Sequence, residues 1–393
     1  MTIRRAAALA FASLLLLALS CSAIDSRRPT LPGRLDDATF WRLFTELSEP
    51  GGTFRSDNLV SNERAFPAVL PEVARRASPG AAYIGVGPEQ NFSYLAALRP
   101  RIAFIVDIRR ENAALHLLYK AIFELSPTRA EFLSRLFSRP LSRHLGSRSS
   151  PNELMEAAAI GIPSRDLFTA NLAEVRAQLT TRHGWPISEA DVVGMTRVYE
   201  AFFERGPDIR YSMRSFRGGR PFPTFAELMT AADARGVAGS FLATEAAYQA
   251  VRDLEARNLV VPVIGDFSGT RALAGVGTFL RNHRLTVAVF YASNVEMYLF
   301  RGDGWKTFYR NLSSLPIDGR SALVRSVFPG FGPGYPGGRS GYSVGGSGYP
   351  GATPGAPGTG VIGVLSVDPI EPLLADIKRG AVAGYGDLLA RMK

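Results

Sequence analysis

The chain has 393 residues, of which 46% are hydrophobic and 20% charged, a composition typical of a globular protein with one large core or two modest ones. Its formal net charge is +10, but the basic residues are mostly arginines that are scattered along the chain and form no block of five or six. We interpret this charge as an arginine-rich solvated surface and do not expect nucleic acid as a partner.

Residues 1–23 have the pattern of an export signal. Two arginines precede an apolar run at residues 6–19, which is shorter than the roughly 20 residues of a membrane span and is followed by small residues. Cys21, the only cysteine, stands where lipoprotein processing would make it the lipidated first residue. We therefore expect an exported protein that is anchored to a membrane by a lipid on Cys21. The alternatives are ordinary cleavage near Ala23, an uncleaved anchor, or a wrong start codon and a cytoplasmic protein.

The first elements of a parallel sheet follow. Residues 81–86 form a short apolar run between a Pro-Gly and a Gly-Pro pair, which is typical of a strand buried on both faces. The pattern then predicts a helix at 89–98, a second buried strand at 102–106 and a helix at 111–125. Strand, helix, strand, helix is the order of a right-handed parallel unit.

The sheet pattern resumes after a long helical interval. Residues 259–264 and 285–291, which we count as the fourth and fifth strands, flank a predicted helix at 271–282. Residues 321–328 and 360–367 predict an antiparallel hairpin whose turn is expanded by a Gly/Pro/Tyr-rich insertion. The expected fold class is therefore α/β, with a Rossmann-like, mostly parallel sheet, a C-terminal antiparallel hairpin and a helical insertion.

These patterns divide the chain into parts. The parts are an export signal (1–23), a tether (24–39), the N-terminal part of the Rossmann-like domain (40–126), a mainly helical insertion or cap (127–257), the C-terminal part of that domain (258–328), a Gly/Pro/Tyr-rich disordered loop (329–360), and the last strand with C-terminal helices (361–393). Residues 54–67 have no clear period, and their polar side chains fit either a pocket wall or a capped helix entry.

The turn after the first strand carries the strongest chemical signal. Gly85 and Gly87 would let the backbone approach a ligand, and the helix that follows presents unpaired N–H groups to it. Asp107 lies 22 residues after Gly85, at the end of the neighbouring strand, where a carboxylate can accept hydrogen bonds from ribose hydroxyls. Gln90 occupies the place of the third glycine of a dinucleotide motif, which disfavours NAD and favours an adenosyl ligand without a pyrophosphate.

These residues resemble the class I S-adenosylmethionine-dependent methyltransferases over residues 81–112 and, more loosely, over 259–367. The resemblance implies a methyltransferase-like sheet and S-adenosylmethionine as cofactor. It implies that the adenosyl ligand is bound by Gly85, Gly87, Glu89, Gln90 and Asp107. Methyl transfer would then be in line from the sulfonium to a positioned nucleophile, without a metal. The whole pattern is also similar to an uncharacterised bacterial family with this core.

Two later strand ends converge on the same crevice in a doubly wound sheet. Asp266 and Asn294 follow these strands and are the candidate catalytic residues, with Tyr291 and Glu296 as candidate pocket residues. The chain lacks the Asn-Pro-Pro-Tyr signature of many methyltransferases there, and Asp266 and Asn294 fit equally well as turn and cap residues. The four histidines show no paired spacing, so we expect no metal site.

Two main functions stay open, beside a nucleotide-dependent enzyme of another type. The first is a methyltransferase-like protein, enzymatic or not, that binds an adenosyl ligand. The second is an exported, lipid-anchored protein that uses the same fold as a non-catalytic binding or interaction module, since S-adenosylmethionine is kept in the cytosol. For the first we expect Asp107→Ala to abolish ligand binding with little effect on stability, because we interpret Asp107 as an exposed strand-end carboxylate. The pattern indicates neither a substrate nor an oligomeric state.

Overall fold

The computed structural model describes most of the chain, in four stretches: residues 30–141, 144–212, 222–327 and 364–391. The predicted export signal with Cys21 and the Gly/Pro/Tyr-rich segment at 329–360 lie outside the described residues. Export, lipidation and membrane anchoring therefore stay predictions from the sequence. Within the four stretches, no helix is long and apolar enough to cross a membrane.

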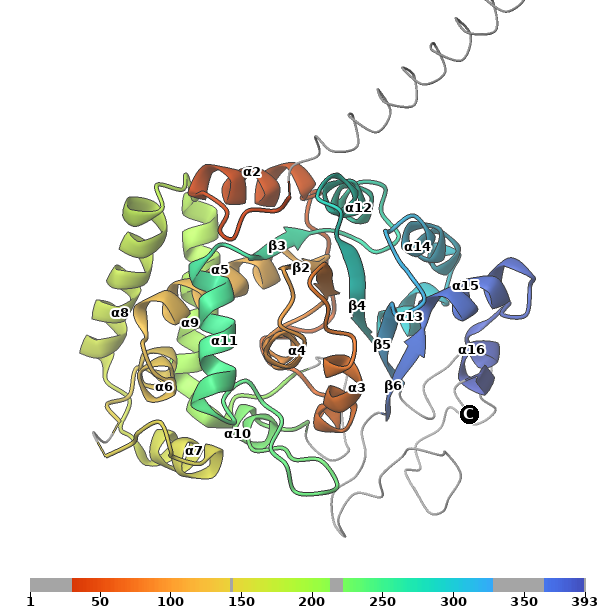
Figure 1. The fold of residues 1–393 in the computed structure, drawn as a ribbon. Coiled ribbons are helices and arrows are strands. Elements are labelled where there is room, and N and C mark those ends of the chain that lie inside the picture. The colour runs from red at the N-terminus through yellow and green to blue at the C-terminus, as the bar shows by residue number, and fades with distance from the viewer. Residues whose placement is uncertain (1–29, 142–143, 213–221, 328–363, 392–393) are drawn as a thin grey trace, which may run out of the picture.

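A six-stranded sheet lies at the centre of the molecule, with its strands in the order β3-β2-β1-β4-β5-β6 (Figure 1). The strands are β1 (Ala81–Gly85), β2 (Ile102–Asp107), β3 (Val260–Ile264), β4 (Thr286–Ser293), β5 (Ala322–Val327) and β6 (Val364–Pro369). Neighbouring strands run parallel, except that β5 and β6 are antiparallel, with Ala322 opposite Pro369. The predicted α/β, Rossmann-like sheet with its C-terminal antiparallel pair is confirmed.

The count of the strands was wrong by one. The strands that end before Asp266 and Asn294 are the third and fourth, not the fourth and fifth. Because β3 pairs with β2, Asp266 lies beside the strand end that carries Asp107, and the Gly265 N–H donates to the Asp107 carbonyl at 2.9 Å. The strand order reverses between β1 and β4, and ligands of open α/β sheets bind at such a switch point.

Helices cover both faces of the sheet, which explains why every residue of β1, β2, β3 and β5 is buried. On one face lie α3 (Leu70–Ala74), α4 (Gln90–Leu98), α5 (Arg110–Leu125) and α11 (Glu245–Ala256) (Figure 1). On the other lie α2 (Asp37–Leu47), α12 (Ala272–Asn282) and α14 (Gly304–Ser313) (Figure 1).

The remaining helices belong mainly to the interval 127–257 and to the C-terminus. They are α6 (Arg129–Phe137), α7 (Pro151–Ile160), α8 (Arg165–Ala177), α9 (Glu189–Arg205), α10 (Phe225–Met229), α13 (Val295–Leu299), α15 (Ile370–Lys378) and α16 (Tyr385–Arg391). Capping boxes start α6, α7 and α10, at Thr128, Ser150 and Thr224. Helices α6, α8 and α9 pack on α5, and α11 packs on α4 and α5 before the chain enters β3.

A buried ion cluster around His183 fastens this helical interval to α2 and α5. The two ring nitrogens of His183 lie 2.7 Å from Asp37 Oδ1 and 2.8 Å from Glu124 Oε2. Burial acts to raise the pKa of Glu124, but the hydrogen bond from His183 and the charge of Lys120, 2.9 Å away, outweigh it and lower the pKa to about 2.

Glu124 should therefore stabilise the fold in a defined acid range. Its ordinary pKa is 4.5, so the folded state holds the charged form more strongly than the unfolded state does. The resulting stabilisation, about 3 kcal/mol, is fully present above pH 4.5 and is lost as the pH falls towards 2. We expect the urea midpoint of the wild type to fall more steeply over this window than that of Glu124→Gln. Parallel slopes for the two proteins would contradict this assignment.

Candidate functional site

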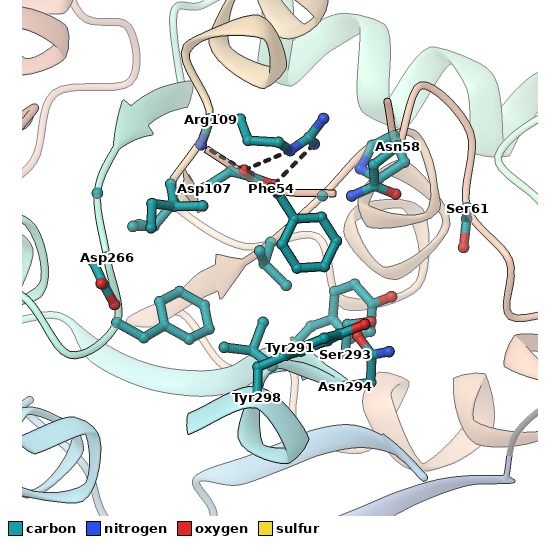
Figure 2. A pocket seen from close by; sticks show the side chains of 18 of the residues that line it. Phe54, Asn58, Ser61, Asp107, Arg109, Asp266, Tyr291, Ser293, Asn294 and Tyr298 are labelled. Atoms are coloured by element: carbon teal, nitrogen blue, oxygen red, sulfur yellow. Dashed lines mark hydrogen bonds and ion pairs between the residues drawn. The ribbon is translucent and has the colours of Figure 1, made fainter. Parts of the chain in front are cut away.

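A pocket opens at the carboxyl ends of β1, β2, β3 and β4, where the strand order reverses (Figure 2). Its empty space, including the open mouth and the solvent in it, is about 920 Å³. Its walls come from the loop at 54–62, the turn between β1 and α4, and the residues that follow β2, β3 and β4. A pocket therefore lies at the carboxyl ends of the strands, where the sequence pattern predicted a ligand.

The turn after β1 is held in shape by Asn91. The Asn91 amide donates to the carbonyl oxygens of Val86, Gly87 and Pro88 at 3.0, 3.1 and 2.7 Å. Gly85 makes this possible, since a Cβ there would lie 2.0 Å from Asn91 Oδ1. Gly85 was predicted to face the ligand, but its open side is taken by Asn91. It shapes the turn and is not part of the pocket lining.

Gly87 lies in the pocket wall with φ +76°, in the left-handed region that favours glycine. Its carbonyl oxygen lies 2.9 Å from His116 Nε2. Burial lowers the pKa of His116 to about 4, so the ring is neutral at pH 7 and its Nε2–H donates this bond. The sequence assigned no role to His116, because a single histidine within a helix does not reveal what it faces.

Asp107 ends β2 and lines the pocket, but it is only 4% exposed. Its Oδ1 accepts a hydrogen bond from the Arg109 N–H at 2.9 Å, and the Arg109 guanidinium lies 3.3 Å from both carboxylate oxygens (Figure 2). Arg109, which the sequence pattern did not reveal, also lines the pocket and donates to the Asp57 carbonyl at 2.5 Å. The interpretation of Asp107 as an exposed carboxylate was wrong, and because it neutralises a buried guanidinium we now expect its loss to destabilise the fold.

Of residues 54–67, those at 54, 58, 61 and 62 line the pocket, which agrees with the first interpretation, and the stretch then enters a 3₁₀ helix at Phe66–Val69 that has no side-chain cap. Glu89 fixes this wall, since both its carboxyl oxygens accept from the Ser61 N–H, at 3.1 and 3.2 Å. Burial raises the pKa of Glu89 to about 8, so the group is mostly protonated at pH 7. Glu89 was predicted to bind the ligand directly, but it contacts the loop and is not part of the lining.

Asp266 and Asn294 both line the pocket, from the ends of β3 and β4. In Figure 2, Asp266 lies at one side of the pocket and Asn294 at another, next to Ser293. The Asp266 Oδ1 atom accepts from the N–H and the hydroxyl of Ser268 at 2.7 and 2.8 Å, so Asp266 also has the turn role that the sequence left open. Asn294 precedes α13, but its side chain does not cap that helix.

Glu296 was predicted to face the pocket, and this prediction was wrong. It is 3% exposed, its Oε2 lies 3.0 Å from Arg325 Nε, and its Oε1 accepts from the Tyr309 hydroxyl. The prediction treated Asn294 and Glu296 as neighbours on one face, as they would be on a strand. The chain turns into α13 at Val295, and residues two apart on a helix face different directions.

A buried hydrogen-bond network around Glu63 adjoins the pocket. Glu63 Oε1 accepts from the Ser293 hydroxyl at 2.5 Å, and Oε2 accepts from the Tyr291 hydroxyl and the Gln90 amide, each at 2.8 Å. The Gln90 carbonyl oxygen accepts from the Ser61 hydroxyl at 2.5 Å. Tyr291, as predicted, and Ser293 line the pocket, whereas Gln90 serves the network behind it. Glu63 and Ser293 were not identified from the sequence.

The pocket is partly aromatic. The rings of Phe54 and Tyr298, both in the lining, meet edge to face with centroids 5.1 Å apart. Of the described residues in the interval 127–257, only Tyr211 lines the pocket, and the lining within the described chain includes no lysine, histidine or cysteine. Nor do the described residues contain a group of three or more His, Cys, Asp or Glu that could hold a metal ion. Such a lining suits a ring-bearing small molecule.

A family model with the description "Domain of unknown function (DUF7790)" matches residues 58–147 and 224–344, together more than half of the chain. The matched residues include the turn after β1 and the ends of β2, β3 and β4. The helices between the two matched parts lie outside the match. No curated protein matches the chain.

Proposed function

Because the chain belongs to the DUF7790 family, whose description assigns no activity, we propose a function from the pocket: a methyltransferase-like protein that binds an adenosyl ligand, S-adenosylmethionine or a close analogue. The observation that carries the proposal is the presence of Gly87, Asp107 and Asp266 in one pocket at the switch point of the sheet. A nucleoside needs a turn that allows close approach and a carboxylate for its ribose hydroxyls.

The strand order supports a pose for this ligand. Neighbouring strands lie about 4.8 Å apart, so the ends of β3 and β4, with β2 and β1 between them, are about 14 Å apart. This distance suits a base, a ribose and an amino-acid tail placed in a line. In the proposed pose the base lies near Phe267, the ribose at Asp107, and the amino-acid part crosses Gly87 towards Ser293.

The pairing of Asp107 with Arg109 is compatible with a ribose contact. A carboxylate has about four positions for accepting hydrogen bonds. The guanidinium lies 3.3 Å from both oxygens, longer than the 2.7–2.9 Å of a strong charge-assisted bond. Arg109 therefore holds the carboxylate in place and leaves acceptor capacity for ribose hydroxyls.

S-adenosylmethionine supplies an activated methyl group when it is bound. The chain would then need only to hold a nucleophile in line with that group. Asn294, which lines the pocket at the end of β4, is the polar side chain that we assign to this task. With no lysine, histidine or cysteine in the described lining, the rate of such a reaction would come from positioning.

Isothermal titration of the purified protein with S-adenosylmethionine and S-adenosylhomocysteine tests the proposal. We expect micromolar binding of at least one of them, equivalent to about −8 kcal/mol. A well-folded sample that binds neither would contradict the proposal. It would favour the second candidate, an exported protein with a lipid on Cys21 that uses the fold as a non-catalytic binding or interaction module. The pattern of residues 1–23 is the observation that supports that candidate.

A further inference from the structure

Glu63 is a buried carboxyl group that the proposed function does not use. It is 3% exposed, and it accepts hydrogen bonds from the neutral side chains of Ser293, Tyr291 and Gln90, with the neutral Ser326 hydroxyl also beside it. Two of these partners, Ser293 and Tyr291, line the pocket. The state of Glu63 therefore determines which hydrogen-bonding groups this end of the pocket presents to a ligand.

An ionised carboxylate only accepts hydrogen bonds, and a hydroxyl has a single proton to donate. Ser293 and Tyr291 both donate that proton to Glu63, at 2.5 and 2.8 Å. The Gln90 amide also donates to the Tyr291 oxygen at 3.2 Å, so that oxygen already accepts a hydrogen bond. The Ser293 oxygen is then left as a hydrogen-bond acceptor that lines the pocket and has no proton to offer.

The backbone holds Ser293 in this place. Its φ is +50°, an uncommon value for a residue other than glycine, and the register between β4 and β5 shifts between Tyr291 and Ser293. Residues kept in such conformations are concentrated at ligand and catalytic sites.

We propose that Glu63 is a positioning residue that fixes the Ser293 hydroxyl as an acceptor, so that this end of the pocket binds an ammonium or amino group of the ligand. The inference rests on the proposed function, in which this group is the α-ammonium of the amino-acid part. The charges agree: of the described residues that line the pocket or belong to the Glu63 network, Asp107, Asp266 and Glu63 are acidic and Arg109 is basic.

Binding of the ammonium group is coupled to the protonation state of Glu63. Burial raises the pKa of Glu63 against the hydrogen bonds from Ser293, Tyr291 and Gln90. A protonated Glu63 would donate to one of its partners and turn Ser293 into a donor. An ammonium group selects the ionised form, so its binding releases a proton at pH values where Glu63 is protonated in the free protein, and releases none at higher pH.

Titrations with two probes test the inference. S-adenosylhomocysteine carries the ammonium group, and 5′-methylthioadenosine has the same adenosyl thioether without the amino-acid part. We expect Glu63→Gln and Ser293→Ala each to weaken S-adenosylhomocysteine binding about tenfold or more and to leave 5′-methylthioadenosine binding unchanged. Glu255→Gln, in α11 and also buried at 1% exposure, is the matched control and should change neither.

Proton release on binding is a second measurement, because a purely structural role of Glu63 would not produce it. Titrations of S-adenosylhomocysteine at a series of pH values, each in two buffers of different ionisation enthalpy, should give enthalpies that differ between the buffers for the wild type as the pH falls, because the buffer takes up the released proton, and equal enthalpies for Glu63→Gln. Equal losses for both probes, or no proton release at any pH of the series, would overturn the role of Glu63 alone. Failure of both probes to bind the folded wild type would overturn the proposed function and this site with it. Ser293→Ala decides the question if Glu63→Gln does not fold.

Discussion

Arg325→Met should lower the free energy of unfolding by about 3–5 kcal/mol. Arg325 is 1% exposed, and its Nε lies 3.0 Å from Glu296 Oε2 and 3.4 Å from Asp368 Oδ2. Methionine has a similar volume but no charge, so the buried Glu296 carboxylate would lose its counter-ion. The cost of that unpaired charge exceeds the gain from a more apolar side chain. Urea denaturation of both proteins measures the difference.

Two further variants identify the cause of the loss. Arg325→Met combined with Glu296→Gln removes both charges and should cost less than the sum of the two single changes. Arg165→Met breaks an ion pair with Glu200 whose side chains are 56% and 36% exposed, and it should cost less than about 1 kcal/mol. If Arg325→Met costs as little as Arg165→Met, the buried pair has no special role in stability.

The strands could be predicted because each is a short apolar run between turn residues, and this local pattern is sufficient for a buried parallel strand. Which strands are neighbours in the sheet could not be predicted from such a local pattern. That β3 lies beside β2, and so brings Asp266 next to Asp107, depends on contacts between residues far apart in the chain. Helix α13 was missed because it begins directly after β4, and the misplacement of Glu296 followed from this.

Part of the site could also be predicted from the sequence, and part could not. Gly87, Asp107 and Tyr291 line the pocket because strand ends of a parallel sheet meet at one edge, a rule that the sequence pattern can use. Glu63 lies in a loop without periodicity and meets Tyr291, 228 positions further along the chain. Ser293 could have been predicted as a pocket residue, since it follows Tyr291 by two positions and shares its face of β4.

Asp107→Ala should have two large effects, of which only the first was expected from the sequence. The affinity for S-adenosylhomocysteine should fall about 100-fold or more, because two ribose hydroxyls lose a charged acceptor. The free energy of unfolding should fall by about 3–5 kcal/mol, since the Arg109 guanidinium, itself 4% exposed, would stay buried without its carboxylate. Isothermal titration and urea denaturation of the same sample measure both.

The double variant Asp107→Asn with Arg109→Met separates the two effects. It removes both charges, and the introduced amide keeps a side-chain oxygen that can accept from the N–H of residue 109, so most of the stability should return. The ribose contact needs a carboxylate that accepts from two hydroxyls, and an amide has only one oxygen for this purpose. Binding should therefore stay weak while stability recovers. If binding recovers with stability, Asp107 serves only to neutralise Arg109, and the pocket holds its ligand without a ribose contact at β2.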